Sequence, residues 1–158
     1  MTSFEDLEIG HEAEIGSHTF TAEEIVAFAR RWDPQPFHID AEAAAKSLFG
    51  GLCASGWHTA CAWMRLNVDY GKRLAAEAIA AGEEPPRFGP SPGISNLKWP
   101  RPVYEGDTIS YGWRITFKRP LASRPEWGLV QYDAYGLNQD GQSVLTFEGK
   151  FFMGRQRA

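Results

Sequence analysis

The longest apolar helical pattern in the chain is residues 55–70, SGWHTACAWMRLNVDY. From Trp57 onward, apolar residues recur at the three- and four-residue spacing of one helix face, at Ala60, Cys61, Met64 and Val68. Ser55 is a residue type that caps helix N-termini, so the helix should begin directly after it. The helix should reach about Tyr70, with a further helical piece over residues 72–81, and form the buried centre of the fold.

Upstream of this stretch, the sequence predicts one strand and two shorter helices. Residues 12–17 favour an edge strand. Thr21 with Glu24 three residues later is the pattern of a capping box, followed by an amphipathic helix. Asp40 should cap a short alanine-rich helix over residues 41–46.

Downstream, the apolar period changes from helical to two. Strands are expected over residues 94–99, 108–118, 127–138 and 143–153, with a hairpin turn at residues 139–142. In the second of these strands, alternate residues form one apolar face: Ile109, Tyr111, Trp113, Ile115 and Phe117. Helices followed by a run of antiparallel strands predict an α+β fold.

Composition excludes several classes of protein. The length of 158 residues predicts a single domain over residues 1–158, and the aromatic share of 13% predicts a large core or an oligomer interface. The net charge of −4 without a basic stripe argues against nucleic acid as a partner. No signal peptide opens the chain and no apolar run is long enough to span a membrane, so we expect a cytoplasmic protein with reduced cysteines.

The segment that carries chemistry is residues 31–40, RWDPQPFHID, which contains the pattern D-x-x-P-x-H. Pro34 and Pro36 restrict both their own backbone and that of the residue before them, so the preceding helix should stop at Asp33. Asp33 and His38 are five residues apart and can act as general base and general acid. Taken alone, the segment is equally compatible with turn chemistry and a packed histidine.

A second candidate element is the start of the long helix at Ser55 and Gly56. Free N–H groups at a helix N-terminus carry partial positive charge and can stabilise an oxyanion. Base, acid and donors together would make a site that forms an enolate. Taken alone, Ser55-Gly56 reads as an ordinary helix cap.

In combination, these motifs resemble the MaoC-like acyl dehydratases, also called R-specific enoyl-CoA hydratases. The resemblance runs from about Phe4 to Met153 and rests on D-x-x-P-x-H-x-D at residues 33–40, on Ala54-Ser55-Gly56, and on Trp99-Pro-Arg-Pro-Val with Gly106-Asp107-Thr108 before the paired strands. It implies a hot-dog fold, in which an antiparallel sheet wraps one central helix. Two positions depart from the family pattern: Gln35 stands where Asn is usual, and Cys61 stands where a hydroxyl residue near the aspartate is common.

The resemblance also implies an activity, the reversible addition of water to a trans-2-enoyl-CoA to give a 3-hydroxyacyl-CoA, as in fatty acid metabolism. Asp33 would activate the water, His38 would move the Cα proton, and Ser55 and Gly56 would bind the substrate's thioester oxygen. Coenzyme A is then part of the substrate, and no other cofactor is expected. A homodimer or higher oligomer is expected, because a single sheet leaves its edges and one apolar face to be covered.

Two other functions remain open: an acyl-CoA thioesterase on the same fold, and a non-catalytic acyl-CoA-binding module. The cations Lys98, Arg101 and Arg119 suit either coenzyme A phosphates or, more simply, isolated surface positions. The histidines lack the spacing of metal ligands, so no metal is expected.

Overall fold

The computed structural model describes residues 3–156, which form one antiparallel sheet and four helices. The helices are α1 (Ala22–Trp32), α2 (Pro36–Ile39), α3 (Ala41–Ala45) and α4 (Gly56–Ala80). The strands are β1 (Glu12–Thr19), β2 (Gly93–Lys98), β3 (Thr108–Leu121), β4 (Arg124–Leu137) and β5 (Ser143–Gly154). They lie in the order β1-β3-β4-β5-β2, so β1 and β2 are the edges.

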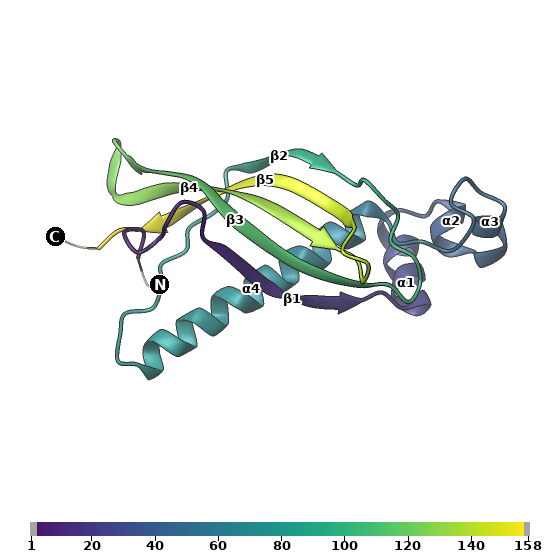
Figure 1. Ribbon diagram of the computed structural model, residues 1–158, viewed down its shortest axis with the longest axis horizontal. Coiled ribbons are helices and arrows are strands. Elements are labelled where there is room, and N and C mark those ends of the chain that lie inside the picture. The colour runs from purple at the N-terminus through teal and green to yellow at the C-terminus, as the bar shows by residue number, and fades with distance from the viewer. Residues whose placement is uncertain (1–2, 157–158) are drawn as a thin grey trace.

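The long helix α4 lies along one face of the sheet, and the three short helices gather at the end where α4 begins (Figure 1). The two ends of the described part of the chain lie at the opposite end of the molecule (Figure 1). The segment between α1 and α3 therefore comes to the N-terminus of α4, which brings together the two motifs that the sequence analysis selected.

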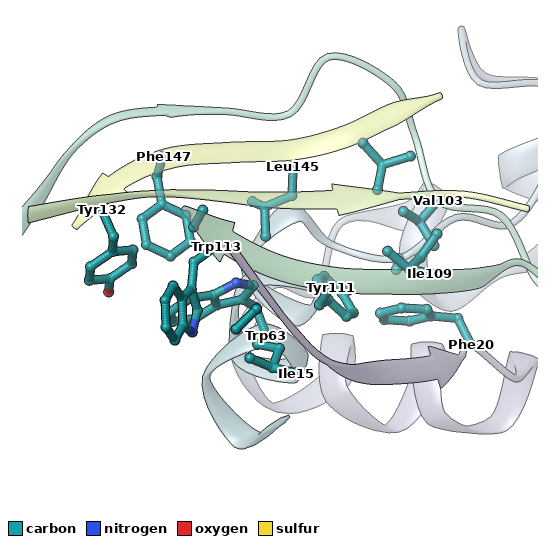
Figure 2. Close-up of a cluster of buried hydrophobic side chains, with 14 of the residues drawn as sticks. Ile15, Phe20, Trp63, Val103, Ile109, Tyr111, Trp113, Tyr132, Leu145 and Phe147 are labelled. Atoms are coloured by element: carbon teal, nitrogen blue, oxygen red, sulfur yellow. The ribbon is translucent and has the colours of Figure 1, made fainter. Parts of the chain in front are cut away.

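Trp63 anchors α4 on the sheet. Its side chain is fully buried, its ring stacks on Tyr132 at 5.7 Å and meets Phe147 edge-on at 4.8 Å, and Figure 2 shows it among the sheet's aromatic side chains. Its indole N–H donates to the Gly112 carbonyl at 3.1 Å, so the buried polar atom is paired. Truncating a buried tryptophan of this kind to alanine costs about 3–5 kcal/mol, so this contact holds the helix in place.

The central helix differs from its prediction in two respects. It is one continuous helix from Gly56 to Ala80, because Gly71 does not interrupt it; a Cβ at Gly71 would make an ordinary 3.5 Å contact with the Phe88 ring. The predicted buried face was wrong: Cys61 is exposed and Met64 is 47% exposed, whereas Trp63 is buried. The cause is that α4 rests on the sheet through the Trp63 side only, and its other side faces outward in the single chain.

The predicted strands and caps are confirmed, with small changes of length. Thr21 and Glu24 form the capping box, and Asp40 caps α3 by accepting from the Ala43 N–H at 2.8 Å. In β3 the apolar alternation holds up to Ile115; a register shift then turns Phe117 outward. The preceding helix ends at Trp32, next to the predicted stop at Asp33, and the segment after it contains a short helix that was not predicted, α2, which Pro36 starts because its fixed φ suits a first helical turn.

Candidate active site

Asp33 and His38 are held close together by the turn between α1 and α2. Asp33 ends α1, donating its N–H to the Ala29 carbonyl, and its φ of −152° and ψ of 68° lie outside the helical region, as expected before Pro34. Gln35 is extended, with φ −75° and ψ 141°. The turn leaves Asp33 Oδ2 at 3.5 Å from His38 Nε2.

His38 is buried, with 6% of its surface exposed, and a hydrogen bond on the side away from Asp33 fixes its ring orientation. Its Nδ1 lies 2.7 Å from the backbone carbonyl oxygen of Cys53. A carbonyl oxygen only accepts hydrogen bonds, so Nδ1 must carry the proton in this contact. The other nitrogen, Nε2, faces Asp33 and is left to accept or to deliver a proton.

Both oxygens of the Asp33 carboxylate accept a hydrogen bond from a side chain. Ser55 Oγ donates to Oδ2 at 2.6 Å, and Gln35 Nε2 donates to Oδ1 at 2.8 Å. Burial pushes the pKa of Asp33 upward, but these two hydrogen bonds and the His38 charge outweigh burial, so the pKa lies below the ordinary value. Asp33 is therefore an ionised carboxylate at neutral pH.

The N-terminus of α4 lies beside this carboxylate, because Ser55 contacts Asp33 and also caps the helix. Ser55 Oγ also accepts the N–H of Trp57 at 3.2 Å, which makes Ser55 the N-cap of the helix. No acceptor among the described residues pairs with the N–H of Gly56. A side chain at Gly56 has no room, because its Cβ would lie 2.5 Å from two carbons of the Trp99 ring.

The four residues selected from the sequence, Asp33, His38, Ser55 and Gly56, thus lie in one place. Cys61, which stands where the family often has a hydroxyl residue, is exposed and has no contact with Asp33. Thr59 does not replace it, because its hydroxyl donates to the Gly56 carbonyl at 2.7 Å. The hydroxyl that reaches Asp33 comes from Ser55.

The remaining polar candidates have other partners. His58 packs between aromatic rings, stacked on Phe28 at 4.5 Å. Asp107 is structural, since it accepts hydrogen bonds from the Tyr104 N–H and from the Gln139 side-chain amide. Lys98, Arg101 and Arg119 are exposed, and no group of three or more metal-binding side chains occurs within residues 3–156.

Two contributions to the site were not predicted. The sequence marked Gln35 only as a departure from Asn, and the structure places its amide on Asp33. The Cys53 carbonyl has no sequence signal at all, because any residue supplies a backbone oxygen.

The chain is similar to known proteins over most of its length. The family model of the MaoC like domain matches residues 8–122. A solved MaoC-like dehydratase from Rhodospirillum rubrum is 37% identical, with a TM-score of 0.85 over 100% of both chains. YdeM of Bacillus subtilis, an uncharacterised protein, is 28% identical over 92% of this chain and 93% of its own.

The fold is shared more widely. The R-hydratase PhaJ1 from Pseudomonas aeruginosa, 23% identical, superposes with a TM-score of 0.65 over 98% of this chain and 86% of its own. The five-stranded antiparallel sheet with α4 along it is thus the expected hot-dog fold, of α+β class. With the family model spanning most of the chain, the protein belongs to the MaoC-like dehydratase family.

Proposed function

We propose that this protein is a hydro-lyase that adds water reversibly to a trans-2-enoyl-CoA thioester and forms a 3-hydroxyacyl-CoA. Membership of the MaoC-like dehydratase family supports hydratase or dehydratase chemistry in general. The observation that carries the proposal is the pairing of an ionised Asp33 with a buried His38 whose Nε2 faces it at 3.5 Å. A carboxylate and an imidazole in this relation suit a reaction that moves two protons.

In the hydration direction, the oxygen of a water molecule bonds to Cβ of the substrate while Asp33 takes one of its protons. Electrons of the double bond move toward the thioester carbonyl, and Cα then takes a proton from Nε2 of a protonated His38. The proton on Asp33 returns to Nε2 across the 3.5 Å gap, which restores both groups. The Cys53 carbonyl keeps the other ring proton on Nδ1 throughout, at 2.7 Å.

The thioester oxygen gains negative charge in this step and needs a hydrogen-bond donor. We assign it to the N–H of Gly56, in the first turn of α4, where free N–H groups and the helix dipole favour an anion. The reaction transfers no electrons to an acceptor, so the proposal includes no cofactor besides the coenzyme A of the substrate.

An apolar cavity of about 460 Å³ supplies a place for the acyl chain. It is open to solvent and is lined by α4, by the sheet and by the loop after α4, with Met64, Gly71, Phe88 and Tyr132 among its residues. The cavity begins about 14 Å along the helix axis from Ser55, which an acyl chain of roughly ten carbons spans at about 1.3 Å per carbon. We therefore propose that longer acyl chains reach it.

A second copy of the chain is proposed to cover the exposed apolar surface near the site. Trp57 is 54% exposed and meets Trp99 edge-on at 5.2 Å, beside the edge strand β2. Exposed tryptophans beside an open sheet edge are typical of an interface. Light scattering of the purified protein should give the mass of a dimer or of a multiple of it.

No helix within the described residues is long and apolar enough to cross a membrane. A cytoplasmic location remains our proposal. It is consistent with the two free cysteines, Cys53 and Cys61.

The test is the loss of enoyl-thioester absorbance when purified protein meets a series of trans-2-enoyl-CoAs. Asp33→Asn and His38→Ala should each lower the hydration rate by about 10²–10⁴-fold while the protein stays folded. Hydration that survives both substitutions would contradict the assignment. Release of free thiol from acyl-CoA would instead indicate a thioesterase, and binding without turnover an acyl-CoA-binding module.

A further inference from the structure

The hydroxyl group of Ser55 makes two hydrogen bonds of opposite sense. It accepts the N–H of Trp57 at 3.2 Å, which caps α4, and it donates its only proton to Asp33 Oδ2 at 2.6 Å. Ser55 is 1% exposed, so its hydroxyl is shielded from bulk water. One buried atom therefore joins the start of the central helix to the carboxylate.

We propose that Ser55 is a positioning residue for the reaction, holding Asp33 in one orientation relative to His38 and to the Gly56 N–H. The inference rests on the proposed hydratase function. The Ser55 hydroxyl has one proton, and it donates that proton to Asp33. The hydroxyl therefore acts on the reaction through the carboxylate and donates no hydrogen bond to the thioester oxygen.

The oxygen that Ser55 holds is the one that matters for proton transfer. Oδ2 is the carboxylate oxygen that lies 3.5 Å from His38 Nε2, whereas Gln35 holds the other oxygen, Oδ1. Gln35 is exposed, so its bond competes with water and restrains the carboxylate less. Without the Ser55 hydroxyl, the carboxylate can rotate about Cβ–Cγ and Oδ2 loses its fixed distance to Nε2.

Within the described residues, no other hydroxyl is placed to take over. Thr59, one turn into α4, donates to the Gly56 carbonyl. Cys61 is exposed, and a thiol is a weak donor in any case. The site therefore depends on Ser55 for its buried donor to Asp33.

Replacing Ser55 separates its two roles. Ser55→Gly removes the hydroxyl but keeps a residue that tolerates the N-cap position with little loss of helix stability. We expect kcat/KM for hydration to fall roughly 10- to 100-fold, the range of a hydrogen bond to a charged group. The loss should fall mainly on kcat, and the acid limb of the kcat/KM profile should move to higher pH because the pKa of Asp33 rises.

Ser55→Thr keeps a hydroxyl on the same carbon and should restore most of the rate and the position of the acid limb. Thr21→Gly is the matched control, because it also removes a hydroxyl N-cap, on α1, without contacting Asp33. It should lower the melting temperature and leave the pH profile unchanged.

An NMR titration of the Asp33 carboxyl carbon keeps the inference separate from the proposed function. The pKa of Asp33 should be higher in Ser55→Gly than in the wild type, whether or not any enoyl-CoA is turned over. If the wild-type protein hydrates no thioester but the pKa of Asp33 rises in Ser55→Gly, the hydratase proposal is refuted and the control of Asp33 by Ser55 is supported. An unchanged pKa and profile in Ser55→Gly, or a rise in KM with kcat unchanged, would overturn the positioning role.

Discussion

Gly56→Ala is the change whose effect the structure defines most sharply. A Cβ at this position would lie 2.5 Å from Cδ2 and Cε2 of Trp99 and 2.9 Å from its Nε1. Ordinary contacts begin at about 3.4 Å, so the ring must move by roughly 1 Å. Overpacking of this kind costs about 1–3 kcal/mol, against which the better helix propensity of alanine returns up to about 1 kcal/mol. Stability should therefore fall by about 0–3 kcal/mol.

Activity should fall further than stability. If Trp99 resists, the first turn of α4 shifts instead, and the Gly56 N–H leaves the position that the thioester oxygen needs. Loss of one donor of this type costs about 10²–10³ in kcat. Urea unfolding would measure the stability and the enoyl-CoA assay the rate.

The double variant Gly56→Ala with Trp99→Ala removes the contacting ring and serves as the control. It should recover a substantial part of the rate that Gly56→Ala loses, beyond any effect of Trp99→Ala alone. Equal rates for the single and double variants would refute the steric argument. A wild-type rate in Gly56→Ala would refute the assignment of the Gly56 N–H as donor.

Three further predictions concern other parts of the molecule. Burial lowers the pKa of His58 to about 4, with a smaller contribution from His18, so the unfolded chain takes up a proton below about pH 6.5 that the folded chain refuses. The free energy of unfolding should thus decline from pH 7 toward pH 4, by no more than about 1–2 kcal/mol from this partly exposed group. Urea unfolding of His58→Leu should show a weaker pH dependence of stability than the wild type. An unchanged pH dependence would contradict the assignment to His58. Gly71→Leu extends a side chain into the apolar cavity and should lower kcat/KM roughly tenfold for acyl chains of about 14 carbons, with four-carbon chains as the internal control. An equal loss at both lengths would exclude the cavity as the acyl site. Gln35→Ala removes the exposed donor to Asp33 Oδ1 and should lower kcat less than Ser55→Gly does. A larger loss of kcat in Gln35→Ala, measured in the same assay, would contradict the argument that the more buried hydrogen bond restrains Asp33 more.

The parts of the fold that the sequence predicted depend on neighbouring residues. The capping box at Thr21, the cap at Asp40 and the end of α1 before Pro34 all arise from side chains within a few residues of the backbone they affect. Alternation in β3 holds for the same reason until the bulge that turns Phe117 outward. A bulge is set by pairing with another strand, and no local pattern announces it.

The parts that were missed depend on contacts between distant residues. Gly71 suggests a break between two helical pieces, but α4 runs through it as one helix, which Trp63 fixes on the sheet. Ser55 and Asp33 are 22 residues apart, and the packing of α1 against α4 brings them together. The sequence could therefore select the residues of the candidate site without predicting which of them touch.

The two departures from the family pattern, Gln35 and Cys61, are best judged by chemical groups rather than by positions. An ionised carboxylate in a half-buried site needs a donor on each oxygen, or its pKa rises with burial. Gln35 brings an amide donor to Oδ1, the same group that an asparagine carries. The buried hydroxyl donor, absent at Cys61, comes from Ser55 at the start of the same helix. Both requirements of the carboxylate are thus met in this chain, so neither departure by itself argues against a working Asp33–His38 pair.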